Sequence, residues 1–243
     1  MAKYGLVGKD ISYSFSKKFF SDKFEIEGLK DTYQNFDLCS IENFPGIFSE
    51  CHNIKGLNVT IPYKESIIPF LDKIDKEAEK IGAVNTIKVD KNNRLKGYNT
   101  DYYGFAKSLA NFLPIKNKTA LILGTGGASK AVAYVLETMD FEYKFVSRTK
   151  TASNLTYKDL NNNIIADHFL IINTTPVGTF PDIRRFPTLP YQYIGKDHVL
   201  FDLIYNPQET EFLKLGYAQG ARVSNGLKML EFQALRSWEI WNK

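Results

Sequence analysis

The sequence has few cysteines and no long apolar run. Cys39 and Cys51 are its only cysteines, and they form neither a CxxC pair nor a repeated framework, which disfavours a disulfide scaffold and a zinc site. No apolar stretch approaches the roughly 20 residues that a membrane-spanning helix needs, and residues 1–10 lack the regions of a signal peptide. We therefore expect a cytoplasmic protein with free thiols, no metal and no membrane partner.

Histidine and clustered charge are also scarce. His52, His168 and His198 stand alone in different contexts, and each is better explained as a surface or structural residue, so proton transfer must use other groups. The formal net charge of +4 comes from lysines scattered along the 243 residues. This pattern favours a solvated surface over a nucleic-acid-binding patch, and we expect no nucleic-acid partner.

What the chain does have is a repeated alternation of strands and helices. Apolar patterning predicts strands at 4–7, 32–36 and 56–60, and helices at 16–25 and 41–52, the second broken at Pro45-Gly46. A second unit begins near Tyr102, with strands at 119–124, 141–147, 168–173 and 199–205, a helix at 128–138 and an amphipathic helix at 227–241. The alternation predicts an α/β fold with mainly parallel sheets covered by helices, and the continuous apolar run at 119–124 predicts a strand buried on both faces.

The strongest local signal is LILGTGGASKAVAYVL at 121–136, where a strand runs into a glycine-rich turn and then a helix. Glycine allows the tight turn and the close approach that bring helix N-terminal amides to a pyrophosphate. Ser129 stands where the GxGxxG pattern has its third glycine. The alternative is a glycine-rich turn that binds no ligand, but the strand and helix around it favour a dinucleotide site.

The end of the next strand indicates which dinucleotide is bound. An acidic residue there would accept hydrogen bonds from the ribose of NAD, but this sequence has Ser147-Arg148-Thr149-Lys150. An arginine can stack on adenine and pair with a 2′-phosphate. This segment favours NADP over NAD, with a solvent-exposed basic strand end as the alternative.

Three polar clusters lie at strand ends of the first unit, at 58–64, 82–86 and 97–101. Each alone could be a capped turn. Together with the glycine-rich turn they make the sequence resemble the shikimate dehydrogenase family nearly end to end. The matching motifs occur in the family's order: NVTIPYK (58–64), AVNT (83–86), NTD (99–101), GTGGAS (124–129), SRT (147–149), INTTPVG (172–178), FDLIYNP (201–207) and NGLKMLEFQA (225–234).

The resemblance implies an N-terminal α/β substrate domain, residues 1–101 with the C-terminal helix 227–243, and a Rossmann-type NADP-binding domain, residues 102–226. It implies NADPH-dependent reduction of 3-dehydroshikimate to shikimate by a monomer or homodimer. By matching position, Lys64 and Asp101 are the catalytic pair. Substrate ligands are Ser14, Ser16, Thr60, Asn85, Tyr205 and Gln233, and cofactor residues are Gly124, Thr125, Gly126, Gly127, Ala128, Ser147, Arg148, Thr149, Lys150, Leu203 and Gly226.

The chemistry of a ketone reduction agrees with this assignment. Negative charge develops on the ketone oxygen as hydride arrives, so a positioned acid must supply a proton. With no suitable histidine, the Lys64 ammonium is the natural donor, oriented by a neighbouring carboxylate. Tyr13, Lys17 and Lys228 depart from the family pattern.

Two alternatives remain at this stage. One is a quinate/shikimate dehydrogenase of broader substrate range, although Arg148 argues against a form that prefers NAD. The other is a non-catalytic nucleotide-binding relative on the same scaffold, and retention of Lys64 and Asp101 speaks against it. Glutamyl-tRNA reductase and methylene-tetrahydrofolate dehydrogenase share a similar nucleotide domain, but they do not account for the serine pair together with NVTIPYK.

Overall fold

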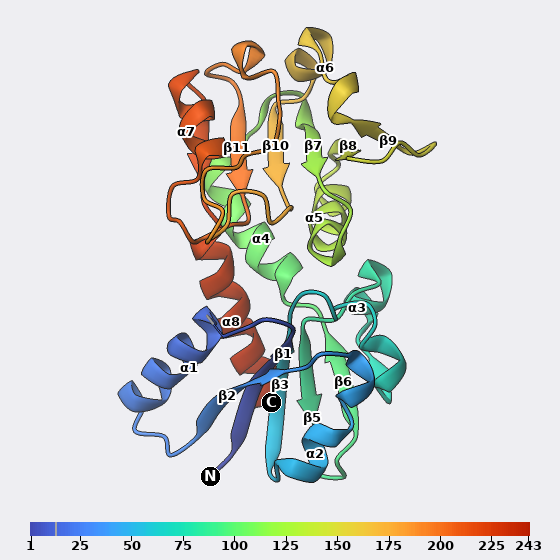
Figure 1. Cartoon of the computed structure of the whole chain (residues 1–243), viewed down its shortest axis with the longest axis vertical. Helices are drawn as coiled ribbons and strands as arrows, with labels where there is room; N and C mark the ends of the chain where they lie inside the picture. The colour runs from blue at the N-terminus through green and yellow to red at the C-terminus, as the bar shows by residue number, and fades with distance from the viewer. Residues whose placement is uncertain (13) are drawn as a thin grey trace. The chain divides into compact units, whose positions relative to one another are not determined.

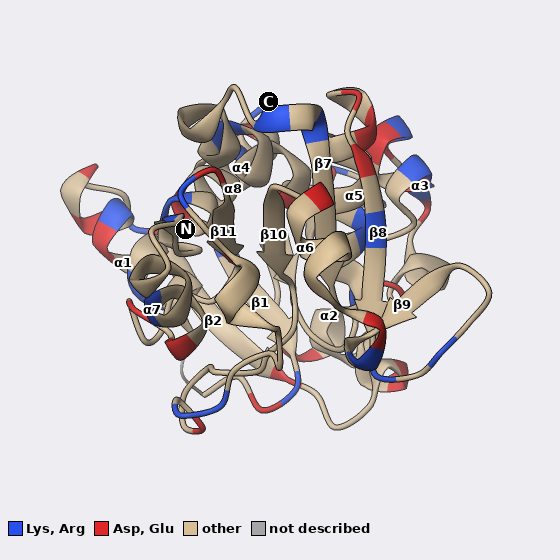
Figure 2. Cartoon of the chain, turned by 90° about the horizontal axis from the view of Figure 1, so that it is seen from above, with Lys and Arg blue, Asp and Glu red and all other residues tan. Residues whose placement is uncertain are grey.

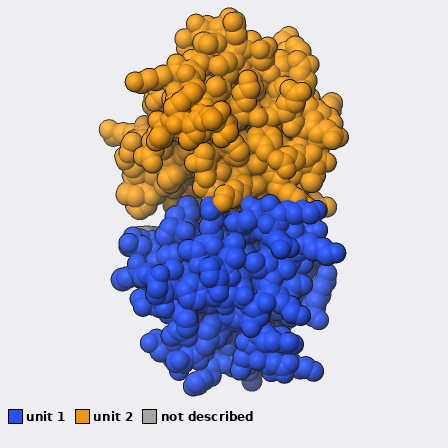
Figure 3. Space-filling view, turned by 90° about the vertical axis from the view of Figure 1, so that its right-hand side faces the viewer, with its two compact units in different colours: residues 1–100, 233–243 blue, residues 101–232 orange. Residues whose placement is uncertain are grey.

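A computed structural model describes residues 1–12 and 14–243, so the predicted departure at Tyr13 lies outside the described residues. The chain divides into two compact units, shown in blue and orange in Figure 3. The first comprises Met1–Thr100 and Gln233–Lys243, and the second comprises Asp101–Phe232. The sequence prediction placed the domain boundaries after residues 101 and 226. The structure instead assigns Asp101 and the first turns of the last helix to the second unit.

The first unit is built on a mixed sheet. In spatial order its strands are β2 (Thr32–Asp37), β1 (Lys3–Gly8), β3 (Ile54–Val59), β5 (Thr86–Val89), β6 (Leu95–Tyr98) and β4 (Lys73–Ile74). Strand β1 is parallel to both β2 and β3, whereas β5 pairs antiparallel with β3 and with β6. The expectation of a mainly parallel sheet therefore holds for the first three strands, and the β5–β6 hairpin is an antiparallel addition that the strand–helix alternation did not reveal.

Helices cover both faces of this sheet (Figure 1). Along β1, Tyr4 and Leu6 pack with α1 (Phe15–Ile26) and α8 (Leu227–Trp241), while Val7 faces the opposite core, to which α2 (Gly46–Glu50) and α3 (Lys76–Ile81) contribute. This alternation follows from the two-residue period of a strand. Trp241, the last residue of α8, lies in the same core as Tyr4 and Leu6. Its indole N–H donates to the Ile87 carbonyl at 3.0 Å.

The second unit has a parallel sheet. Its spatial order is β12 (Arg222–Ser224), β11 (Val199–Asp202), β10 (Leu170–Asn173), β7 (Thr119–Leu123), β8 (Glu142–Ser147) and β9 (Asn154–Thr156), and every pair of neighbours is parallel. The helices are α4 (Asp101–Leu109), α5 (Gly127–Thr138), α6 (Asn162–Asp167) and α7 (Glu211–Ala218). Short 3₁₀ turns occur in both units at Ile41–Asn43, Ile68–Phe70, Ala110–Phe112, Lys116–Lys118, Tyr157–Asp159 and Tyr191–Tyr193.

The central strands of this sheet are buried on both faces, as the continuous apolar run predicts. In β7, Ala120 and Ile122 belong to one core and Leu121 and Leu123 to the other. Helices α4 and α5 supply the first core, and α6 and α7 supply the second. The carboxyl ends of parallel strands meet at one edge of such a sheet, where ligands of this architecture bind.

The surface carries both signs of charge. Lysine and arginine are interspersed with aspartate and glutamate on helices and loops (Figure 2), and several form exposed pairs one helical turn apart, such as Lys18–Asp22 and Arg236–Glu239. Within residues 1–12 and 14–243, no helix combines the length and the apolarity that crossing a membrane requires.

Candidate active site and cofactor-binding site

The glycine-rich turn adopts a conformation that explains its composition. Gly124 follows β7 with a φ of +106°, a region that other residues rarely adopt. A Cβ on Gly124 would lie 2.9 Å from both the Thr174 hydroxyl oxygen and a Thr175 methyl carbon. Thr174 in turn donates its hydroxyl hydrogen to the Leu123 carbonyl at 2.7 Å. The turn after β7 and the INTTPVG segment after β10 are thus packed together, and only glycine fits at their contact.

Gly126 has the opposite property. It is the N-cap of α5 with extended backbone angles, φ −83° and ψ −179°, and no side chain caps the helix there. A Cβ on Gly126 would meet nothing within 4 Å. An open surface directly before the amides of a 12-residue helix suits a pyrophosphate, because the helix N-terminus carries partial positive charge and unsatisfied N–H groups. The residues of this turn therefore fit a dinucleotide cofactor.

Ser129 explains the imperfect glycine pattern. Its side chain is 1% exposed and donates to the Gly126 carbonyl at 2.7 Å. The backbone N–H of Ser129 donates to the same carbonyl at 2.9 Å. The serine thus packs inside the first turn of α5 and holds the N-cap residue by two hydrogen bonds, so loss of the third glycine leaves the turn intact.

The basic segment at the end of β8 is held by a residue that the sequence motifs did not identify. Asn154 is 8% exposed, and its amide donates to the Ser147 hydroxyl at 2.7 Å and to the Thr149 carbonyl at 2.9 Å. Its oxygen accepts from the backbone N–H of Thr151 at 2.6 Å. Asn154 lies between Ser153 and Leu155, a context that gives no sequence signal, and only the fold shows that it closes this loop.

The two cations of the segment differ in their surroundings. The Lys150 ammonium lies 2.7 Å from the Asp159 carboxylate, and this hydrogen bond is the largest cause of the lowered pKa of Asp159, about 2. Arg148 is exposed at the strand end and contributes a smaller, opposing influence on the raised pKa of Tyr157, which burial dominates. Of the two predicted cations, Arg148 is the better placed to receive a phosphate.

The residues predicted to lie near the nicotinamide are in contact with one another. A Cβ on Gly226 would lie 2.1 Å from the Leu203 carbonyl oxygen, and the Gly226 N–H donates to the Ile204 carbonyl at 2.9 Å. The segments after β11 and β12 therefore run together at the carboxyl edge of the parallel sheet. Tyr205, a predicted substrate ligand, lies half-buried in the same segment of the second unit.

Asp202 at the end of β11 is a buried carboxylate that the sequence reading did not single out. It is 0% exposed and accepts hydrogen bonds from the Thr210 hydroxyl (2.6 Å), the Asn173 amide (3.0 Å) and the backbone N–H of Ile204 (3.0 Å). Burial raises its pKa from the ordinary 3.8 to about 6, because the charged form loses its hydration, while these three donors act in the opposite direction.

This carboxyl group predicts a pH dependence of stability. Between pH 3.8 and about 6, folded Asp202 holds a proton that the unfolded chain has released, so the free energy of unfolding falls as pH rises through this window. The raised pKa of Asp202 contributes roughly 3 kcal/mol to the free energy of unfolding. This contribution is present in full below the window and is lost above it. Asp202→Asn should remove this slope. Urea unfolding at several pH values from 4 to 7 measures it, with exposed Asp197→Asn as the control; parallel curves for wild type and Asp202→Asn would contradict the assignment.

In the first unit, both predicted serines lie at the start of α1. Ser14 is the N-cap, and its oxygen accepts from the Lys17 N–H at 3.2 Å. Ser16 lies in the first turn, and it acts against the rise in the pKa of Tyr33 that burial causes. Both serines are partly exposed. They stand at the N-terminus of a 12-residue helix, a position that favours an anion.

Backbone hydrogen bonds join the three polar clusters of the first unit. Val84 N–H donates to the Lys64 carbonyl at 2.7 Å, Val59 N–H to the Asn85 carbonyl at 2.8 Å, and Asn85 N–H to the Tyr98 carbonyl at 3.0 Å. Thr60 extends the strand pairing, because its N–H donates to the Val7 carbonyl at 2.9 Å. Segments 58–64, 82–86 and 97–100 therefore form one polar edge of the mixed sheet.

Two predicted substrate ligands meet directly at this edge. The Asn85 amide donates to Gln233 Oε1 at 2.8 Å and to the Thr100 hydroxyl at 3.0 Å. Lys64 lies half-buried in the first unit, whereas Asp101 is 2% exposed and is the first residue of α4 in the second unit. The pairing of Lys64 with Asp101 stays a prediction.

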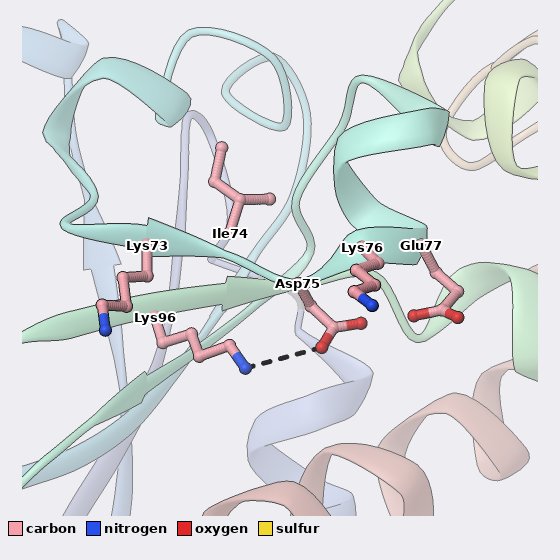
Figure 4. A pocket seen from close by; sticks show the side chains of 6 residues that line it. All are labelled: Lys73, Ile74, Asp75, Lys76, Glu77 and Lys96. Carbon is pink, nitrogen blue, oxygen red and sulfur yellow. Dashed lines mark ion pairs between the residues drawn. The ribbon is translucent and has the colours of Figure 1, made fainter.

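A separate surface pocket of about 420 Å³ lies beside β4 and the start of α3, lined by Lys73, Ile74, Asp75, Lys76, Glu77 and Lys96. In Figure 4 the Lys96 ammonium points toward Asp75, 3.6 Å from its oxygen. None of the predicted site residues lines this pocket. In the part of the chain that the structure describes, no group of three histidine, cysteine or acidic residues is arranged to hold a metal ion.

Known proteins resemble the chain over nearly all of its length. A family model for the shikimate dehydrogenase substrate binding domain matches residues 6–87. The shikimate dehydrogenase (NADP(+)) of Methanosphaera stadtmanae is 38% identical over 256 residues, covering 98% of this chain and 90% of the relative. The crystal structure of shikimate dehydrogenase from Aquifex aeolicus is 36% identical with a TM-score of 0.88, covering 100% and 92% of the two chains. That of shikimate 5-dehydrogenase from Thermus thermophilus, in complex with NADP(H) and shikimate, is 32% identical with a TM-score of 0.87, covering 99% and 93%.

Proposed function

The chain belongs to the shikimate dehydrogenase family, and on this basis we propose that it reversibly reduces 3-dehydroshikimate to shikimate with NADPH. The similarity of almost the whole chain to NADP-dependent shikimate dehydrogenases carries the proposal. Two features add support: the parallel-sheet unit has an open, glycine-lined helix N-terminus, and the other unit joins Asn85 to Gln233.

The proposed roles divide between proton transfer and recognition. NADPH, when bound, supplies hydride to the ring ketone carbon. Lys64 donates a proton to the oxygen on which charge develops, and Asp101 orients the ammonium and the adjacent ring hydroxyl. Hydroxyl and amide groups hold the substrate: Ser14 and Ser16 take its carboxylate, while Thr60, Asn85, Gln233 and Tyr205 take the ring.

The cofactor roles follow the parallel sheet from strand to strand. Residues 124–128 hold the pyrophosphate at the start of α5. Ser147, Arg148, Thr149 and Lys150 receive the 2′-phosphate end, and Leu203 and Gly226 lie against the nicotinamide. The open surface at Gly126 supports the first of these roles, and the exposure of Arg148 supports the second. The choice of NADP agrees with the names of the relatives.

Cofactor choice can be tested at Arg148. A charge-assisted hydrogen bond contributes about 1.5–3 kcal/mol, so Arg148→Ala should raise KM for NADPH by roughly 10- to 100-fold while scarcely changing KM for NADH. The control is Lys144→Ala, since Lys144 is an exposed cation on the same strand. Equal losses with both cofactors would show that Arg148 does not read the 2′-phosphate.

The activity itself is tested by NADP⁺ reduction with shikimate and with quinate, side by side. We expect turnover of shikimate and a much lower kcat/KM for quinate. Comparable values for both would identify a quinate/shikimate dehydrogenase, and cofactor binding without turnover would identify a non-catalytic relative. We further propose a cytoplasmic enzyme, monomeric or homodimeric, whose partners are small molecules and neither nucleic acid nor a membrane.

A further inference from the structure

A fully buried hydroxyl joins the last helix to the mixed sheet of the first unit. Ser237 of α8 is 0% exposed. Its oxygen accepts from the Asn58 amide at 3.0 Å and lies 2.8 Å from the Thr86 hydroxyl and 3.2 Å from that of Thr100. Its hydrogen is directed to the Gln233 carbonyl at 3.0 Å. With no exposed surface, Ser237 cannot itself touch a substrate.

One branch of this network reaches two proposed substrate ligands. Gln233 lies one turn before Ser237 on α8, so the Ser237 contacts fix the turn that carries it. The Asn85 oxygen accepts from the backbone N–H of Thr100 at 2.6 Å, while its NH₂ group faces Gln233 Oε1 at 2.8 Å. Rotating either amide by 180° would set donor against donor or acceptor against acceptor. The network therefore specifies which atoms of Asn85 and Gln233 face one another.

The other branch reaches Tyr33 of β2. The Tyr33 hydroxyl donates to Asn58 Oδ1 at 2.8 Å. Tyr33 is 4% exposed, and its ring stacks on Phe20 with 4.8 Å between centroids. Asn58 is thus engaged on both ends of its amide. A continuous series of hydrogen bonds runs from Tyr33 through Asn58 to Ser237 and on to the turn of α8 that carries Gln233.

We propose that Ser237 and Tyr33 are positioning residues for substrate recognition. Ser237 orients the amides of Asn85 and Gln233 toward the ring hydroxyls, and Tyr33 holds Asn58, whose amide donates to Ser237. A fully satisfied buried polar network fixes the orientation of amide and hydroxyl groups, which apolar packing does not do. This inference rests on the proposed function and adds two residues that the sequence motifs do not contain.

The test compares shikimate with methyl shikimate, which lacks the carboxylate charge. Ser237→Ala should raise KM for both compounds by roughly 5- to 50-fold, the cost of unsatisfied buried hydrogen-bonding groups. Tyr33→Phe should also raise KM for both compounds, by a smaller factor, because it removes one of the hydrogen bonds that hold Asn58. For both variants we expect kcat to change less than KM and KM for NADP⁺ to stay within about twofold of wild type.

Tyr4→Phe is the matched control, because it removes a phenol hydroxyl from the same aromatic cluster outside this network, and it should leave every KM unchanged. Should Ser237→Ala fail to fold, Ser237→Cys approximates the side-chain volume with a weak hydrogen-bonding group, and it should raise KM for shikimate and its ester in the same way. Equal KM changes for shikimate, its ester and NADP⁺ would overturn the positioning role and leave the proposed function standing. An inactive wild-type protein would reject both.

Discussion

Lys64→Met is expected to lower kcat for 3-dehydroshikimate reduction by about 10²–10⁴-fold, the usual contribution of a general acid. Methionine keeps most of the aliphatic stem of lysine and removes the charge and the proton. Lys64 is half-buried, and its carbonyl accepts from Val84 N–H, a backbone contact that the substitution preserves. Because proton donation is needed only as the alkoxide forms, KM for the substrate should change less than kcat.

Asp101→Asn provides the second half of this prediction. If Asp101 orients both the lysine and the reacting ring, the single variant should also be severely impaired. The Lys64→Met/Asp101→Asn double variant should then be little slower than the poorer single variant, because residues that act as a unit are not additive. Independent roles would instead multiply the two losses.

The comparison needs folded protein and a control substitution at a lysine that has no proposed role in catalysis. Lys73→Met serves as the control, since Lys73 is an exposed lysine of the same unit that lines the charged surface pocket. Steady-state kcat with saturating NADPH is the measurement, and near-ultraviolet circular dichroism checks the fold. A rate for Lys64→Met within about threefold of wild type would reject Lys64 as the proton donor, since loss of a general acid costs far more.

The parallel-sheet unit was the more predictable half of the chain. Strands that are buried on both faces appear as continuous apolar runs, so β7, β10 and β11 were visible in the sequence, and the helix predicted at 227–241 matches α8. The hairpin of β5 and β6 was missed. Its strands have four residues each, and such short strands beside polar clusters resemble turns when only the sequence is available.

The site was predictable where function is read from consecutive residues, and not where it depends on distant ones. The glycine-rich turn and the basic strand end stand out because each ligand contact comes from one short segment. Asn58 and Ser237 are hydrogen-bonded across 179 positions, and Asp202 meets Asn173 across 29. No local pattern marks such pairs, because their partners are chosen by the packing of strands and helices.

Gly126→Val is expected to raise KM for NADPH by about 10²–10⁴-fold while leaving the fold intact. The extended backbone at Gly126, with φ −83° and ψ −179°, suits a β-branched residue, and its Cβ would meet nothing within 4 Å. The added methyl groups would instead occupy the space before the amides of α5, where a pyrophosphate must approach closely. Losing two charge-assisted hydrogen bonds at about 1.5–3 kcal/mol each accounts for the expected factor.

Gly124→Ala is the comparison variant. It should damage the turn itself, whereas Gly126→Val should only exclude the cofactor. Its φ of +106° is unfavourable for alanine, and the new Cβ would lie 2.9 Å from Thr174 Oγ1, so this variant should unfold at a lower temperature before any cofactor is added. Gly126→Val should keep the wild-type Tm without cofactor and lose the rise in Tm that NADP⁺ gives the wild type. Thermal unfolding of both variants with and without NADP⁺ decides the matter: an undiminished NADP⁺-dependent rise in Gly126→Val would place the pyrophosphate away from the N-terminus of α5.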